Sequence, residues 1–221
     1  MAFSNGNSSG SANTVSVLKT SPNTVLDDVK TSMELAGVTQ CLNREIETLL
    51  KINISWQHWY PACSTSPWQL EGVVNALRSL GYKNLVGAHN GTVVVDSYEG
   101  ELNNKHKAVQ DKCDLPVVHL DTPPNLWVDY KPKADMLVLD SIFPEGIQIP
   151  QTFEGKNIIH LPTMKTHVFT TMTGAMKNAF GGLLHRKRHW THSVIHETLV
   201  DLLAIQQEIH PGIFALSLIH I

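Results

Sequence analysis

The stretch from Ser66 to His89, "SPWQLEGVVNALRSLGYKNLVGAH", contains a complete helix signal followed by a strand signal. Ser66 is a typical N-cap, Pro67 suits the first helical position, and Gly81 suits the end of the helix. Apolar residues recur between them at helical spacing: Leu70, Val73, Val74 and Leu77. The short aliphatic segment "KNLVGAH" is then typical of a buried strand. The stretch therefore predicts a helix that leads directly into a strand.

The same alternation extends outward in both directions. Upstream, Asn13–Lys19 is predicted as a strand, a helix is expected to begin at Ser21 and stop at Gly37, and Leu49–Ile54 is predicted as a second strand. Downstream, a weaker helix near 104–113 precedes four short strand-like segments: "LPVVHLD", "LWVDY", "ADMLVLDSIF" and "KNIIHLP". The segment "HSVIHETLVDLLAIQQEIHP" predicts the last helix, and "EGELNNKHK" is interpreted as a solvated turn. Strands that alternate with helices predict an α/β fold with a largely parallel or mixed central sheet flanked by helices.

Composition and charge limit the class of protein. Hydrophobic residues make up 42% of the 221 residues, which is enough for the core of one domain. The formal net charge of −3 gives no overall attraction to nucleic acid or to an anionic membrane, and neither is expected as a partner. Three cysteines without a C-x-x-C spacing indicate no disulfide framework and no iron–sulfur motif. A cytoplasmic location fits this composition best.

The two ends of the chain differ from the middle. Residues 1–12 are polar and rich in Gly, Ser and Asn, and are predicted to form a flexible tail before a single α/β domain at 13–215. The last six residues, "LSLIHI", resemble translated sequencing-adapter sequence. Residues 216–221 are therefore expected to be non-native and the domain to be incomplete at its C-terminus. The alternative is a short apolar terminal strand.

The segment from His160 to Gly182 concentrates polar chemistry. The strand "NIIHL" runs into "PTMKTH", so Lys165 and His167 follow the carboxyl end of a strand, where α/β sheets usually bind ligands. A helix with Thr171 or Thr173 near its N-cap is expected next. One face of that helix carries four residues at i, i+3, i+4 and i+7: Gly174, Lys177, Asn178 and Gly181.

Lysines, hydroxyls and glycines at a helix start suit a phosphate or carboxylate. Gly174 and Gly181 cost helix stability, so the close approach of a backbone or a ligand is the expected reason for them. The alternative is that the glycines only allow the helix to pack while the lysine tips reach solvent.

This central segment, together with "LLKINIS" and the stretch at 64–87, resembles domain-of-unknown-function family 362. The resemblance covers roughly Val15 to Ala215 and implies an α/β fold with a shared ligand site, but no established reaction. Some members carry appended ferredoxin-type cysteine motifs; this chain has none, so an iron–sulfur cofactor is not expected and the cofactor is unknown. Members usually continue with a "VDG"-like strand and a glycine-rich acidic segment. The motifs imply these site residues: Lys51, Asn53, Lys165, Thr166, His167, Thr173, Gly174, Lys177, Asn178 and Gly181.

Histidines supply a further hypothesis. A helical stripe would align four of them, His185, His189, His192 and His196, with Glu197 or Asp201 as added oxygen ligands of a metal. The competing interpretation is a loop that precedes the last helix, with His192 at the start of that helix. His192 is also a candidate acid or base, as is His167.

We therefore expect an enzyme-like protein that binds an anionic small molecule. Lys165 and Lys177 would hold the anion, Thr173 and Asn178 would donate hydrogen bonds, and His167 would transfer protons. The alternatives are a non-catalytic ligand-binding or redox-accessory protein, and a metalloprotein built on His192 and His196.

Overall fold

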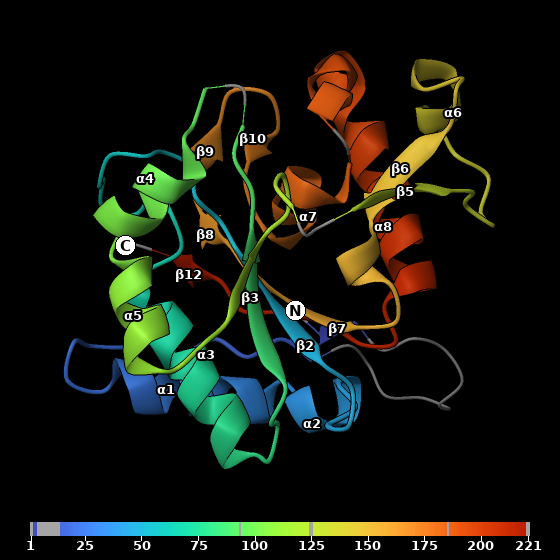
Figure 1. Cartoon of the computed structure of the whole chain (residues 1–221). Helices are drawn as coiled ribbons and strands as arrows, with labels where there is room; N and C mark the ends of the chain where they lie inside the picture. Colours follow the sequence, from blue (N-terminus) through green and yellow to red (C-terminus); the bar gives the residue numbers. More distant parts are fainter. Residues whose placement is uncertain (1, 4–13, 93, 124–125, 185, 220–221) are drawn as a thin grey trace.

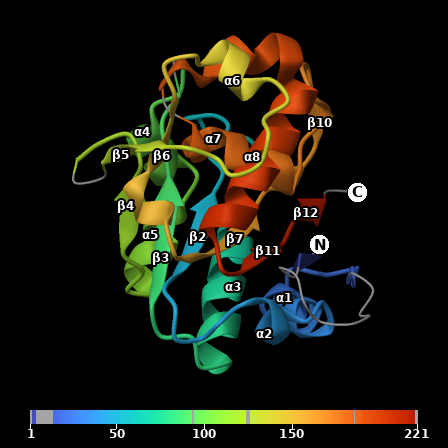
Figure 2. The same ribbon diagram turned by 90° about the vertical axis from the view of Figure 1, so that its right-hand side faces the viewer.

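A parallel sheet forms the centre of the computed structural model, which describes residues 2–3, 14–92, 94–123, 126–184 and 186–219. Its five parallel strands lie in the order β11, β7, β2, β3, β4. Figure 1 shows β7, β2 and β3 at the centre of the molecule, and Figure 2 labels all five. In chain order they are β2 (Thr48–Ile52), β3 (Leu85–His89), β4 (Val117–His119), β7 (Asn157–Leu161) and β11 (Ile213–Ala215). The predicted α/β fold is confirmed.

Helices cover both faces of the sheet, which explains why the strands β2, β7 and β11 are fully buried (Figure 2). One face packs against α1 (Val25–Leu35), α2 (Val38–Cys41), α3 (Pro67–Ser79) and α5 (His106–Lys112) through a core that includes Leu50. The other packs against α7 (Ala175–Leu183) and α8 (Ile195–Ile209) through a core that includes Leu49. Because side chains alternate along a strand, Lys51 shares the face of Leu49 and lies beneath α7.

The strand order reverses between β2 and β7. From β2 the chain adds β3 and then β4 on one side, and it returns to the other side of β2 for β7 and β11. The segments that leave the carboxyl ends of β2 and β7 therefore diverge. Such a topological switch point leaves a crevice in which α/β proteins usually bind ligands.

Two connections carry additional structure. Between β4 and β7 lie β5 (Trp127–Tyr130), α6 (Leu139–Ile142), β6 (Ile147–Pro150) and the 3₁₀ helix η1 (Gln151–Phe153), with β5 and β6 antiparallel. Between β7 and α8 the chain forms three two-residue strands, then α7, then a 3₁₀ helix. The strands are β8 (Thr163–Met164), β9 (Thr166–His167) and β10 (Thr171–Met172), and the 3₁₀ helix is η2 (Arg186–Val194).

The strand predicted at Asn13–Lys19 is wrong. Residues 14–20 form no strand, Val17 is 86% exposed, and Asn13 lies outside the described residues. Alternation indicated an extended chain, but a strand also needs a partner, and this segment instead lies against α1, where Ser32 donates to Ser16. The following helix begins at Val25 rather than after Ser21, which closes a turn by accepting from the Thr24 and Val25 N–H groups.

Two other predictions fail because distant polar contacts override local pattern. The strand expected at "ADMLVLDSIF" is coil and α6, because the Asp201 carboxylate accepts the N–H groups of Leu137, Val138 and Leu139. The supposed solvated turn "EGELNNKHK" belongs to α4 (Ser97–Asn103) and the start of α5. Three of its polar side chains are buried: Glu101, Asn104 and His106.

The chain ends are only partly described. Of the tail predicted at 1–12, Ala2–Phe3 forms β1, antiparallel to β11, and the rest lies outside the described residues. In the segment predicted as non-native, the Leu216 N–H donates to the His160 carbonyl, and Leu218–Ile219 forms β12, parallel to β8. Whether this segment is native stays a prediction.

Candidate functional site

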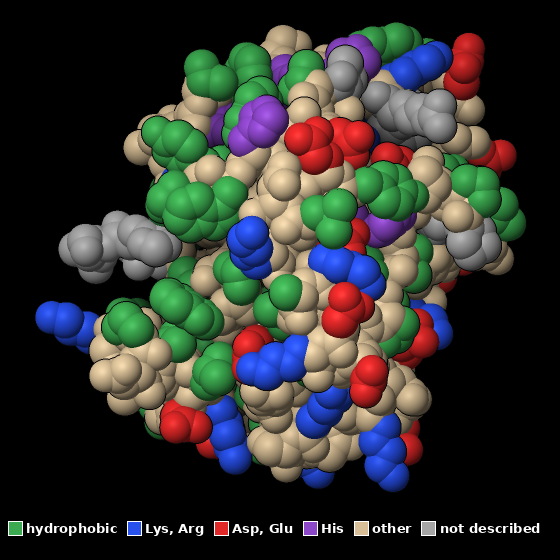
Figure 3. Space-filling model, turned by 60° about the vertical axis from the view of Figure 1, so that its left-hand side comes forward, with side chains coloured by type: hydrophobic (Ala, Val, Ile, Leu, Met, Phe, Trp, Pro, Cys, Tyr) green, Lys and Arg blue, Asp and Glu red, His purple; other side chains and the backbone are tan. Residues whose placement is uncertain are grey.

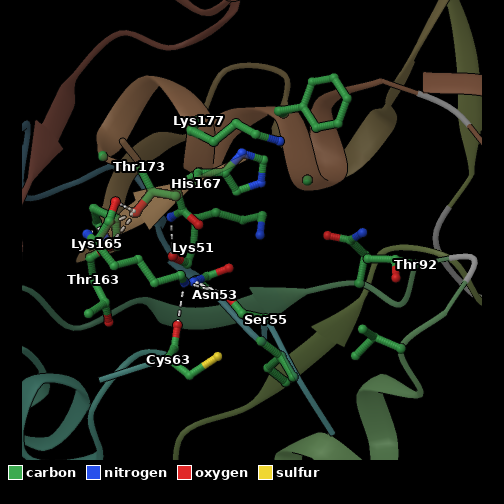
Figure 4. Close-up of a pocket in the computed structure, with 18 of the residues that line it drawn as sticks. Lys51, Asn53, Ser55, Cys63, Thr92, Thr163, Lys165, His167, Thr173 and Lys177 are labelled. Atoms are coloured by element: carbon green, nitrogen blue, oxygen red, sulfur yellow. Dashed lines mark hydrogen bonds between the residues drawn. The ribbon is translucent and has the colours of Figure 1, made fainter. Parts of the chain in front are cut away.

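A cavity of about 610 Å³ lies at the switch point between β2 and β7. Lys51, Asn53 and Ser55 come from the end of β2, and Thr163, Lys165 and His167 come from the chain that follows β7. The lysine of α7, Lys177, closes the opposite wall (Figure 4). Every site residue predicted from the sequence lines this cavity except Thr166, which is exposed on β9.

Lys51 is the most deeply buried cation of the cavity, at 3% exposed. Its ammonium group donates a hydrogen bond to the Ile52 carbonyl at 2.9 Å. Burial lowers the pKa of Lys51 to about 7, and the nearby positive charge of Arg188 adds to that effect. A negative group beside this ammonium would raise its pKa and favour the charged form.

Lys177 and Arg188 add positive charge from α7 and η2. Burial lowers the pKa of Lys177 to about 8, and the charges of Arg188 and Lys165 act in the same direction. Its ammonium group lies 3.8 Å from the centre of the Phe180 ring. Arg188 donates to the Gly91 carbonyl at 2.8 Å. Sequence reasoning missed Arg188, because "HRKRHWTH" gives no sign of which basic residue turns inward.

Lys165 connects the two strand ends. Its ammonium group donates to the Ser55 hydroxyl oxygen at 2.7 Å and to the Cys63 carbonyl. The Asn53 amide donates to the same Ser55 oxygen at 2.9 Å. Since the Ser55 oxygen accepts both bonds, its own hydrogen stays available to a ligand. Ser55 is a second site residue that sequence reasoning missed.

Among the described residues, no carboxylate pairs with the three lysines, whereas the Asp121 carboxylate acts on the charge of Arg188. None of the described Asp and Glu side chains lines the cavity, and none forms an ion pair with Lys51, Lys165 or Lys177. On the face shown in Figure 3, by contrast, basic and acidic side chains are interspersed. The positive charge is thus local to the cavity, in a chain whose formal net charge is −3.

His167 is oriented by its own backbone. Its Nδ1 atom accepts the N–H groups of Phe169, at 3.2 Å, and of Thr170, at 3.4 Å. The neutral ring must then carry its proton on Nε2. Burial, the charges of Lys177 and Lys165 and the neighbouring His192 lower the pKa of His167. This geometry suits a hydrogen-bond donor better than a base, whose lone pair would have to be free.

Thr173 and Asn178 hold the walls together. The Thr173 hydroxyl donates to the Thr163 carbonyl at 2.7 Å, and the Asn178 amide donates to the Lys51 carbonyl at 2.8 Å. Gly174 is the N-cap of α7, so Thr173 lies next to the cap as expected, whereas Thr171 belongs to β10, which pairs with β9. Both side chains therefore position α7 against β2 and β8.

At Gly182 the neighbouring side chains come so close that only glycine fits. Its φ is 117°, and an added Cβ would lie 2.7 Å from Leu120 Cδ1 and 3.0 Å from Lys51 Cε. A Cβ at Gly181 would meet only an ordinary contact, Asn90 Oδ1 at 3.6 Å. Gly174 is intermediate, since its Cβ would lie 3.3 Å from the Met164 sulfur. The close approach that was expected at Gly174 and Gly181 therefore occurs chiefly at Gly182.

The predicted histidine stripe does not form one helix. His189 and His192 lie on η2 and line the cavity, whereas His196 is exposed on α8 and His185 lies outside the described residues. The last helix begins at Ile195, so His192 does not start it, and its ring stacks on Phe169 with centroids 4.5 Å apart. Asp201 is occupied by its backbone contacts.

A comparison with protein families matches residues 48–219 to "Domain of unknown function (DUF362)". The chain belongs to this family. No curated protein and no solved structure gives a match. In this DUF362 protein, the matched range includes both strand ends and all the cations of the cavity. None of its described helices is long and apolar enough to span a membrane.

The DUF362 domain also brings together three side chains that the sequence did not single out. His89 and His119 end the neighbouring strands β3 and β4, and each Nε2 atom lies within 2.9 Å of Glu101 Oε2. Burial raises the pKa of Glu101, but contacts with the two histidines outweigh this effect and leave it at about 2. The available signal was that both strand segments, "KNLVGAH" and "LPVVH", end in histidine.

Proposed function

We propose that this DUF362 protein binds a small anionic molecule, one that carries a phosphate or carboxylate group, in the cavity at the switch point. The observation that carries the proposal is the convergence of Lys51, Lys165, Lys177 and Arg188 on one cavity without a carboxylate among the described residues. Burying unpaired charges is costly, and an anion would offset that cost.

The rest of the lining indicates an organic ligand. The volume of about 610 Å³ lies within the usual range for small-molecule sites. Apolar side chains share the lining with the cations: Ile54, Val94, Val95, Phe169 and Phe180. A molecule with one charged end and one apolar part fits this combination.

Ser55 and His167 complete the recognition of the anion. Each has a hydrogen that its protein contacts leave available, on Oγ and on Nε2 respectively. Proton transfer by His167 would first require its Nδ1 atom to lose two backbone contacts. We therefore assign His167 to binding, and the same pocket serves an enzyme or a binding protein.

Sulfate and citrate are suitable probes, followed by isothermal titration calorimetry and thermal unfolding. Lys51→Met and Lys177→Met keep the apolar stem and remove the charge, and each should weaken binding about 10-fold or more, the value of one charged hydrogen bond. Lys83→Met is the control, because Lys83 is exposed before β3 at the opposite end of the sheet. Equal affinities in all three variants would show that the anion binds elsewhere.

A further inference from the structure

Two histidines lie side by side at the carboxyl edge of the sheet. His89 of β3 and His119 of β4 are register partners in a parallel pair. Register partners in a sheet point to the same face, and here the two ring centroids are 4.4 Å apart. The Tyr98 ring packs edge-on against His119, with centroids 4.0 Å apart, and fixes its orientation.

A carboxylate from the β3–β4 connection meets both rings. Glu101 of α4 accepts from His89 Nε2 at 2.9 Å and from His119 Nε2 at 2.8 Å, in both cases through Oε2. The three candidate ligand atoms all lie within 4.8 Å of one another. Within the described part of the chain, these are the only three His, Cys, Asp or Glu side chains that converge in this way.

The cluster is largely buried. The side chains of His89, Glu101 and His119 are 0%, 8% and 18% exposed. Among the described residues, no lysine or arginine forms an ion pair with Glu101. The cluster therefore offers a metal ion one carboxylate oxygen and two imidazole nitrogens at a place that is largely closed to water.

We propose that His89, Glu101 and His119 form a binding site for a divalent transition-metal ion, with Zn²⁺ as the ion that best fits the donor set. Two imidazole nitrogens and one carboxylate oxygen are a common zinc ligand set. Ligand atoms around tetrahedral zinc lie about 3.3 Å apart. The two His–Glu separations of 2.8 and 2.9 Å would widen by about 0.5 Å once the ion replaces the shared protons, and the two histidine nitrogens, which lie within 4.8 Å of each other, would adjust to the same spacing.

The ion would keep one position open. Three protein ligands and a water are typical of catalytic zinc, whereas structural zinc has four protein ligands. His119 is the most exposed of the three, so the ion and its water would enter from its side. None of the three residues lines the cationic cavity, so this site is separate from the proposed anion site.

The test uses the full chain, purified without an affinity tag, treated with a chelator and dialysed. Isothermal titration with Zn²⁺ and elemental analysis should both give one ion per chain. Glu101→Gln keeps the shape but removes the charge, and His119→Ala removes a ligand; each should weaken Zn²⁺ binding on the order of 100-fold. His58→Ala is the control, since its ring is 63% exposed and outside the cluster.

Thermal unfolding gives a second readout. Zn²⁺ should raise the melting temperature of the wild type and of His58→Ala, but not that of Glu101→Gln. Wild-type protein without stoichiometric zinc, or an unchanged affinity in Glu101→Gln, overturns the proposal. If the variants fail to fold, the visible spectrum of the Co²⁺-loaded wild type decides, because strong four-coordinate bands support the site and weak six-coordinate bands overturn it.

Discussion

At the scale of single residues, Gly182 controls whether Lys51 can stay buried. The break in α7 gives Gly182 a left-handed φ of 117°, and the space where a Cβ would lie belongs to Leu120 and Lys51. Any other residue here combines backbone strain with a collision.

Gly182→Ala should lower the free energy of unfolding by about 2–4 kcal/mol, from backbone strain and overpacking together. Gly146→Ala is the matched control, because its φ is 111° but nothing lies within 4 Å of the added Cβ. It should cost only about 1–2 kcal/mol. Urea unfolding of both variants measures the difference, and equal losses would contradict the crowding.

Single-residue roles were only partly readable from the sequence. Lys165, Lys177 and His167 stand in an unusual local composition, and a sheet edge was the natural place for them. The partners of Thr173 and Asn178 are backbone carbonyls, one of them far away in the chain, so their positioning role could not be read from spacing. Arg188 and Ser55 gave no local signal at all.

At the scale of elements, Asp201 of α8 organises the start of α6. Its carboxylate accepts the N–H groups of Leu137, at 2.7 Å, and of Val138 and Leu139, both at 3.0 Å. The side chain is 2% exposed, so water cannot replace these bonds.

Asp201→Ala should therefore destabilise the protein by about 2–4 kcal/mol, because three backbone donors lose a charged acceptor. Asp140→Ala, an exposed aspartate in the first turn of α6, should change stability by no more than about 0.5 kcal/mol. Thermal unfolding of both variants checks the contrast. A small loss in Asp201→Ala would mean that α6 forms without this contact.

Elements with complete local signals were predicted best. α3 has its N-cap, proline and apolar stripe in one stretch, and its observed start at Pro67 agrees with the expected one. The segments that misled, 14–19, 99–107 and 134–143, are those whose structure depends on a partner in another part of the chain.

At the scale of the whole molecule, the positive charge of the cavity depends on pH. The pKa of Lys51 is lowered to about 7 and that of Lys177 to about 8. The pKa values of His167 and His192 are also lowered, so both rings stay neutral above their ordinary pKa, and the change of charge falls on the lysines.

Sulfate, which keeps its charge, should bind at least about 10-fold more weakly at about pH 9 than at about pH 6, because both lysines lose their protons in between. Below about pH 7 both are charged, and binding is strongest. Calorimetry in buffers of different ionisation enthalpy should detect proton uptake on binding near pH 7–8. A double Lys51→Met, Lys177→Met variant should show no such uptake, and a flat wild-type profile would contradict the assignment.

The depressed lysine pKa values also affect stability. The unfolded chain holds these protons up to an ordinary pKa near 10.4, whereas the folded chain releases them above about 7 and 8. The two buried lysines therefore lower the free energy of unfolding most below about pH 7, and this loss of stability decreases as the pH rises.

The α/β class followed from the alternation of helices and strands, but the order of the strands did not. Placing β7 beside β2, rather than beside β4, is decided by packing across the whole sheet. That placement creates the switch point, and with it the cavity.

The shared space of Lys51 and Gly182 also bears on how this protein can evolve. A side chain gained at position 182 would expel the lysine, while a smaller residue at position 51 would leave a hole beneath α7. Each change is harmful alone, and the two together would remove the contact with Lys51 but keep the backbone strain and the collision with Leu120. The lysine thus restricts which residues position 182 accepts, although the two positions lie far apart in the sequence.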